Sequence, residues 1–140
     1  MKSKNYVLAV LFLLASLALG ACGGVGAAQG DPVEGTSWEL FAISKRKPIS
    51  GSAITLSFED GQVSGSAGCN QYFGSYQVDG EAITIQKLAI TEMACMEPAG
   101  LMEQENLIME FLNDAQRYQL EDSRLMIFRP DGEALTFDRK

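Results

Sequence analysis

The sequence predicts an α+β domain: a curved, mostly antiparallel sheet (a partial barrel) of about seven or eight strands with one helix packed on it. Three Asp-Gly pairs, at Asp60-Gly61, Asp79-Gly80 and Asp131-Gly132, lie between segments in which apolar and polar residues alternate. This is the pattern of hairpins with tight turns. One segment, 98–115, instead repeats its apolar residues with the period of a helix. A strand-rich sheet tends to curl, so we expect the helix to cover its open face.

The expected strands are short alternating segments on either side of these turns. In most of them apolar residues fall on one face with polar residues between them, whereas in 125–128 Leu125 and Ile127 oppose Met126 and Phe128. The segments with this pattern are 38–43, 54–58, 83–85, 87–91, 125–128 and 135–137.

The expected helix carries its apolar stripe at Leu101, Ile108, Phe111, Leu112 and Ala115. Its polar residues, among them Gln104 and Glu105, lie mostly off that stripe, and two methionines seven residues apart widen the buried face. Pro98 is expected in the first helical turn, where its missing N–H has no consequence.

The N-terminus has the parts of an export signal. Lys2 and Lys4 precede an apolar run, 6–19, which is too short for a permanent membrane span. The residues LGAC that follow resemble a bacterial lipobox, which implies cleavage before Cys22 and its acylation. The expected organisation is therefore a lipoprotein signal peptide at 1–21, a glycine-rich tether at 22–35 and one domain at 36–140. The alternative is an ordinary secretory signal with a chance cysteine at its end.

Charge and composition exclude several partners. The formal net charge is −7, and it becomes −9 once the two lysines of the signal are removed. An acidic domain is a poor ligand for nucleic acid, whose phosphates attract a basic face. Membrane association is therefore expected through acyl chains on Cys22, and we expect a monomer without cofactor or metal. Gly23 after the acylated cysteine favours the outer membrane where the cell has two membranes.

The two remaining cysteines, Cys69 and Cys95, have several possible roles. A cysteine nucleophile needs a cationic or histidine base, and the chain contains no histidine. A zinc site needs three or four Cys or His ligands. Outside the cytoplasm two cysteines in one small domain usually form a disulfide, and two buried free thiols are the alternative.

Two motifs around these cysteines resemble the META domain, also called the HslJ-like domain. They are Gly68-Cys69-Asn70-x-Tyr72-x-Gly74-x-Tyr76 and Thr91-x-Met93-Ala94-Cys95, and an early Gly35-x-x-Trp38 fits the same family. The resemblance implies a curved antiparallel sheet with a helix, a pairing of Cys69 with Cys95, and no established enzymatic activity. Members are bacterial envelope proteins, often lipoproteins, and one is heat-inducible.

The expected function follows from export and resemblance together: a non-enzymatic, lipid-anchored protein of the bacterial cell envelope. It would support envelope stress tolerance, or assist another envelope component, by binding a peptide or apolar ligand. Asn70, Tyr72 and Tyr76 are the candidate partner surface, although the residues of 65–76 favour a structural corner, which needs no ligand. Alternatives are a carboxylate-dependent hydrolase and an inhibitor that presents 65–76 to an envelope protease. The basic triplet 45–47 is expected to be solvated, or else to touch lipid headgroups.

Overall fold

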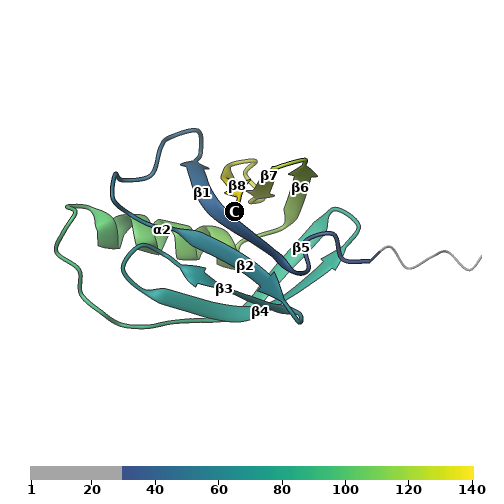
Figure 1. Ribbon diagram of the computed structural model, residues 1–140, viewed down its shortest axis with the longest axis horizontal. Helices are drawn as coiled ribbons and strands as arrows, with labels where there is room; N and C mark the ends of the chain where they lie inside the picture. Colours follow the sequence, from purple (N-terminus) through teal and green to yellow (C-terminus); the bar gives the residue numbers. More distant parts are fainter. Residues whose placement is uncertain (1–29) are drawn as a thin grey trace, which may run out of the picture. The chain divides into compact units, whose positions relative to one another are not determined.

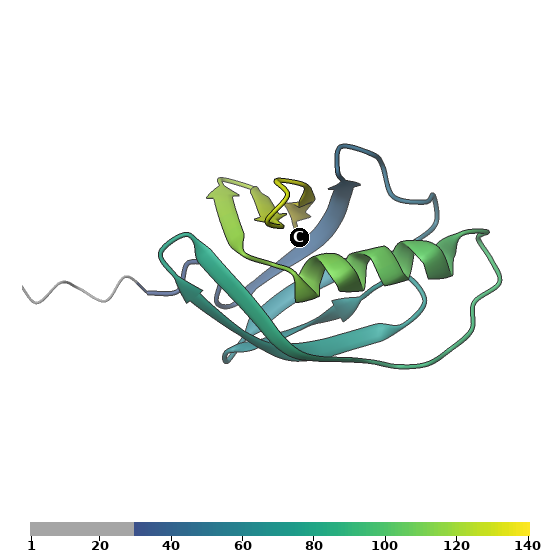
Figure 2. The same ribbon diagram turned by 180° about the vertical axis from the view of Figure 1, so that it is seen from behind.

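The computed structural model describes residues 30–140. The expected signal peptide and its lipidation site, Cys22, lie outside the described residues. Residues Asp31–Lys140 form a single compact unit, shown from two sides in Figures 1 and 2. No helix within 30–140 is both long enough and apolar enough to span a bilayer.

Eight antiparallel strands form a closed barrel in which each strand is hydrogen-bonded to its neighbours in the chain (Figure 1). One helix, α2, lies between β5 and β6 in the sequence. These elements are β1 (Thr36–Ile43), β2 (Thr55–Glu59), β3 (Gln62–Ser66), β4 (Gln71–Asp79), β5 (Ala82–Ile90), α2 (Leu101–Asn113), β6 (Arg117–Glu121), β7 (Arg124–Phe128) and β8 (Ala134–Arg139). The predicted fold class, a mostly antiparallel curved sheet with one helix, is confirmed.

Two of the strand pairs around the barrel differ in how far they are hydrogen-bonded. β1 and β8 pair over most of their length, from Trp38 opposite Arg139 to Ile43 opposite Leu135. β5 and β6 share only the register pair Ala82 and Arg117 before they diverge. α2 covers the barrel where these two strands separate, and it contacts both β5 and β8 (Figure 2).

The Asp-Gly turns lie where the sequence predicts them. Asp60 and Gly61 join β2 to β3, both with positive φ (51° and 71°), as a tight primed turn requires. Asp79 ends β4 and Gly80 follows it in the β4–β5 turn, whereas Asp131 and Gly132 lie within the β7–β8 connection, 129–133. A further tight turn, at Ser44 and Lys45, also has positive φ at both residues (45° and 71°). It carries no glycine, so no local signal predicts it.

β5 joins 83–85 and 87–91, two segments for which the sequence predicts separate strands. Its register with β4 shifts between Phe73 and Ser75, and Lys87, opposite this shift, has a φ of 54°. This β-bulge reverses the alternation of side chains along the strand. The alternation therefore breaks at Lys87 without ending the strand.

α2 begins later than expected. Gly100 precedes it with a φ of 83°, a left-handed conformation that cannot belong to the helix, so the helix starts at Leu101 and Pro98 lies before it. Ile108, Phe111 and Leu112 are completely buried, as predicted. Gln104 and Glu105, expected off the buried stripe, are also buried, at 9% and 3% exposure.

Side chains fill the interior of the barrel. The largest of those under 2% exposed are Trp38, Tyr72, Phe58, Phe111 and Phe137. The folded unit also extends past the expected boundary at Thr36, because Val33 is completely buried in the same cluster. Residues 31–35, expected in the tether, thus belong to the domain.

Candidate functional site

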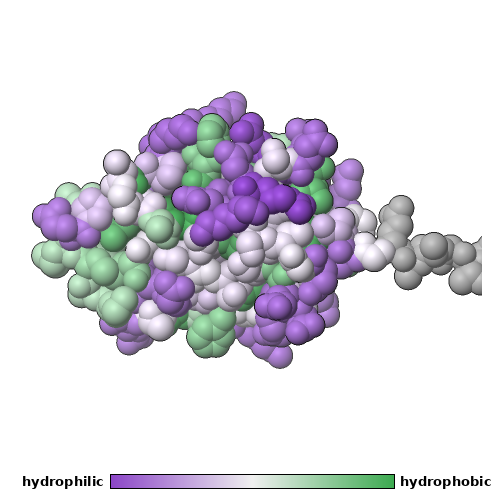
Figure 3. Space-filling model, viewed as in Figure 1, coloured by the Kyte–Doolittle hydropathy of each residue, from purple (hydrophilic) through white to green (hydrophobic). Residues whose placement is uncertain are grey.

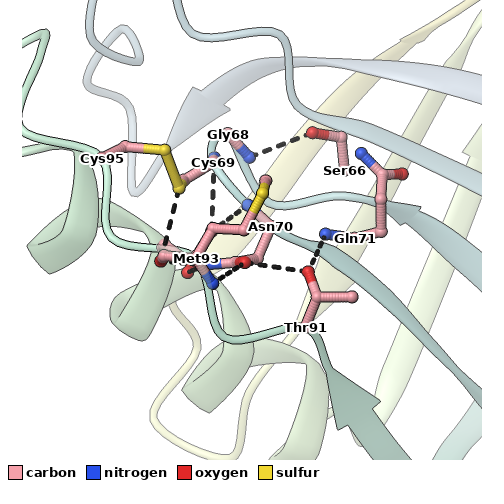
Figure 4. The surroundings of a disulfide bond; sticks show 9 residues. Ser66, Gly68, Cys69, Asn70, Gln71, Thr91, Met93 and Cys95 are labelled. Carbon is pink, nitrogen blue, oxygen red and sulfur yellow. Dashed lines mark hydrogen bonds between the residues drawn. A yellow bond between two sulfur atoms is a disulfide. The ribbon is translucent and has the colours of Figure 1, made fainter.

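Asn70 is the centre of a buried polar cluster at the corner between β3 and β4. Its side chain is 1% exposed and uses all of its hydrogen-bonding capacity. Oδ1 accepts the Thr91 hydroxyl (2.8 Å) and the main-chain N–H of Met93 (2.7 Å). Nδ2 donates to the main-chain oxygen of Met93 (3.0 Å) and to Glu105 Oε1 (2.7 Å). Asn70 therefore holds the chain after β5 as a neighbouring strand would (Figure 4).

Glu105 connects α2 to the same corner. Oε2 accepts the main-chain N–H groups of Asn70 (2.7 Å) and Cys69 (3.3 Å), while Oε1 accepts the Asn70 amide. Within residues 30–140 this carboxylate forms no ion pair. Three N–H donors take the place of water around it, which satisfies a buried acidic group that would otherwise be costly.

A disulfide between Cys69 and Cys95 reinforces these contacts. The two residues are 26 positions apart, with their Cα atoms separated by 5.9 Å. The bond joins the β3–β4 corner to the segment 91–97, and Asn70, next to Cys69 in the chain, holds Met93 of the same segment (Figure 4). Both sulfurs are consumed by the bond, so neither is a nucleophile or a metal ligand in this state.

Two glycines allow the corner to pack closely. A Cβ atom on Gly65 would lie 1.9 Å from the main-chain oxygen of Thr55, which also accepts the Tyr72 hydroxyl at 2.8 Å. Gly68 has a φ of 120°, and a Cβ there would lie 2.8 Å from Leu101 Cδ1. Close approach of β2 and α2 explains the glycines of this motif.

The expected partner surface at Asn70, Tyr72 and Tyr76 is corrected by these positions. The three side chains are 1%, 2% and 5% exposed, and their polar atoms are occupied by groups of the same chain. The aromatic residues face into the barrel because alternate residues of β4 point inward. The stretch 65–76 is a structural corner, so it presents none of the three to a partner.

Tyr76 fastens the first residues of the domain to the barrel. Its hydroxyl lies 2.6 Å from both Asp31 Oδ2 and Glu34 Oε2. Burial raises the pKa of Tyr76, and the two carboxylates raise it further. The Tyr76 hydrogen bond, followed by one from the main-chain N–H of Asp60, lowers the pKa of Glu34. The carboxylates of Asp31 and Glu34 therefore share the Tyr76 hydroxyl.

Large apolar side chains are exposed near the disulfide. Met93 is 56% and Met96 85% exposed, on either side of Cys95, and Phe73 of β4 is 58% exposed. In Figure 3 hydrophobic surface gathers at the end of the molecule where Figure 1 shows the loop that leads into α2. Sequence reasoning missed this exposure because methionine most often belongs to a core.

The polar groups near this corner form no metal centre. Among residues 30–140 there is no group of three or more His, Cys, Asp or Glu side chains placed to hold a metal ion. The acidic residues Glu92, Glu97 and Glu103 are exposed, whereas Glu105 is satisfied by N–H groups. The disulfide and the Asn70 hydrogen bonds hold the segment 91–97, with its exposed methionines, in a fixed position.

The fold and its corner define a class: a small, helix-covered antiparallel barrel fastened by a disulfide. The META domain model matches residues 31–140, and the chain belongs to this family. No curated protein matches the chain.

Solved structures similar to it include the following three. The NMR structure of a protein from Burkholderia xenovorans is 28% identical, with a TM-score of 0.64, over 77% of this chain and 83% of that one. A second NMR structure is 24% identical, with a TM-score of 0.61, over 74% and 88%. A DUF4847 family protein from Bacteroides vulgatus is 16% identical, with a TM-score of 0.55, over 76% and 94%. The last two likenesses establish the fold alone.

Proposed function

We propose that the protein is a lipoprotein of the bacterial envelope, anchored by acyl chains on Cys22, that works by binding and not by catalysis. Its domain would bind an envelope polypeptide through the segment 91–97, and so support stress tolerance or assist another envelope component. The membrane would be the outer one in a cell with two. The Cys69–Cys95 bond supports export, because disulfides persist in oxidising compartments.

The observation that carries the proposal is that Met93 and Met96 are exposed on a segment whose main chain is held in place. Exposed apolar side chains normally belong to flexible or isolated positions, but here a disulfide and the Asn70 hydrogen bonds fix the main chain around them. A fixed apolar segment loses little conformational entropy when a partner binds it. Methionine side chains also adapt to partners of different shape.

The charge beside these methionines favours a particular kind of partner. Glu92 and Glu97 flank them, and both are exposed. A peptide with apolar residues next to lysine or arginine would match this segment in both respects. The barrel interior is filled by core side chains, so the peptide or apolar ligand would bind at the surface.

Site-specific photo-crosslinking in intact cells tests the proposal. A photoreactive phenylalanine analogue at position 96 should crosslink to a discrete envelope protein, whereas the same analogue at exposed Gln119 on β6 should not. Equal crosslinking at the two positions, or none at position 96, would contradict binding through 91–97.

Anchoring is tested separately. The Cys22→Ser variant should lose incorporation of labelled palmitate and no longer sediment with membranes. If it still sediments, the acyl anchor is wrong even where the crosslink at position 96 remains.

A further inference from the structure

The sulfur atoms of the domain differ in how readily they can be oxidised. The chain has three cysteines and six methionines, and Cys22 and Met1 lie outside the described residues, which leaves two and five. Both of these cysteines form the Cys69–Cys95 bond, so no free thiol within residues 30–140 competes for an oxidant. The methionine thioethers are then the sulfur groups that a two-electron oxidant attacks first.

Exposure divides the five methionines of residues 30–140 into two groups. Met96 is 85% and Met93 56% exposed. Met102, Met109 and Met126 are half-buried, and Met109 packs against the core cluster. An oxidant in solution therefore reaches the thioethers of Met93 and Met96 most freely.

The fold does not depend on these two exposed side chains. Asn70 Oδ1 accepts the Met93 main-chain N–H (2.7 Å) and Nδ2 donates to the Met93 oxygen (3.0 Å), while the disulfide holds Cys95. A polar oxygen added to either thioether would stay in water, so no buried group would lose a partner. On Met109 the same oxygen would lie against apolar side chains and lower the stability. Oxidation at 93 and 96 can thus change the surface without unfolding the domain.

The charge beside the two methionines favours one kind of oxidant. Glu92 and Glu97 are exposed next to them in the chain, and no lysine or arginine lies between residues 88 and 116. Carboxylates repel an anionic oxidant but have little effect on a neutral one. Hypochlorous acid is a neutral two-electron oxidant of thioethers.

We propose that Met93 and Met96 are a modification site at which hypochlorous acid forms methionine sulfoxide, a regulation that rests on the polypeptide binding proposed for 91–97. The sulfur lone pair attacks chlorine and displaces hydroxide. Water then displaces chloride from sulfur and supplies the sulfoxide oxygen; of its two protons, one neutralises the hydroxide and the other is released. Sulfur loses two electrons, and chlorine gains them on becoming chloride.

Oxidation would weaken the binding of a partner to this segment. A sulfoxide places a polar acceptor where the thioether was apolar. A partner that covers the methionines with apolar residues offers that oxygen no donor, and should bind the oxidised protein at least about tenfold more weakly. The main chain of 91–97 stays in place, so removal of the oxygen by sulfoxide reductases would restore the surface.

Mass spectrometry of the full chain after treatment with limiting hypochlorous acid tests the site. One oxygen atom should appear on Met96 first and on Met93 next, before Met102, Met109 or Met126 is modified. A chain oxidised only at 93 and 96 should keep the melting temperature of the untreated chain. Equal oxidation of Met109 and Met96, or a lowered melting temperature at that stage, would overturn the proposal.

Photo-crosslinking from Ala94, which is exposed, tests the effect on binding without replacing either methionine. The purified chain is oxidised, freed of oxidant and mixed with envelope membranes. The crosslinked product should fall at least about tenfold relative to the untreated chain. A variant with Met93→Leu and Met96→Leu keeps an apolar surface without the thioethers, so its crosslink should survive the treatment. Met126→Leu on β7 is the matched control, and should respond as the wild type does.

The outcomes distinguish this regulation from the binding on which it rests. An undiminished crosslink from the oxidised wild type overturns the regulation and leaves polypeptide binding standing. Equal losses in the wild type and the double leucine variant also overturn it, because the loss then does not come from these thioethers. No crosslink from the untreated chain overturns the binding through 91–97 and the regulation with it, while the mass spectra still decide the modification site.

Discussion

Glu105 on α2 and Asn70 at the β3–β4 corner are joined twice: one carboxylate oxygen lies 2.7 Å from the main-chain nitrogen of Asn70, and the other lies 2.7 Å from its side-chain nitrogen. The helix and the disulfide-bonded corner are therefore one mechanical unit. The position of the exposed segment 91–97 depends on this unit, because Asn70 also binds Met93.

Glu105→Gln should lower the free energy of unfolding by about 1–3 kcal/mol, because an amide nitrogen replaces one acceptor and faces donors of Asn70 or Cys69. Urea unfolding measures the change. Glu103→Gln, an exposed change on the same helix, should stay within about 0.5 kcal/mol of the wild type. Equal stability of the two variants would refute the role assigned to Glu105.

Removal of the disulfide by Cys69→Ser with Cys95→Ser should destabilise the domain by about 3.5 kcal/mol on the chain-entropy model for a loop of 26 residues. The measurement is a comparison of urea midpoints in the absence of reductant. Adding dithiothreitol should lower the midpoint of the wild type and leave that of the double variant unchanged. If dithiothreitol lowered the urea midpoint of both proteins, its effect would not come from reduction of the Cys69–Cys95 bond.

Gly65→Ala should destabilise the protein by more than about 3 kcal/mol, because its Cβ would meet the main-chain oxygen of Thr55. The melting temperature of the purified protein is the readout. Gly30→Ala is the control, since a Cβ at Gly30 has no atom within 4 Å. A normal melting temperature for Gly65→Ala would mean that β2 moves away from this glycine without cost.

The free energy of unfolding should fall at acidic pH as Glu34 becomes protonated. Its pKa is lower in the folded state than in the unfolded chain, chiefly through the Tyr76 hydroxyl. Its contribution is therefore complete above the unfolded pKa and is lost as the pH falls through the folded pKa. Tyr76→Phe should move the Glu34 pKa back toward its ordinary value, as followed by carbon NMR of the carboxyl group. An unchanged pKa in that variant would exclude the hydroxyl as the main cause.

Local sequence signals predict the strands and the Asp-Gly turns. The turn at 44–45 and the burial of several polar residues have no such local signal. Asp60-Gly61 specifies its turn through its own backbone preferences, whereas Ser44 and Lys45 adopt the same conformation only because β1 and its surroundings impose it. From the sequence Glu105 is predicted to be a surface residue, because the main-chain N–H groups that bind its carboxylate lie 36 and 35 positions away in the chain. Asn70 and Tyr76 were expected at a surface because the closure of the barrel, which buries them, is a tertiary property.

The pairing of β1 with β8 brings the two ends of the domain together: the main-chain N–H of Lys140 donates to the oxygen of Ser37. During synthesis from the N-terminus the barrel cannot close until β8 has been made, because β8 pairs with both β1 and β7. A truncation before Ala134 would remove β8 and leave β1 and β7 each without one neighbour, so it is expected to cost the whole fold. By the same geometry, a linker from residue 140 back to residue 31, where the folded unit begins, would let the chain start at another surface turn.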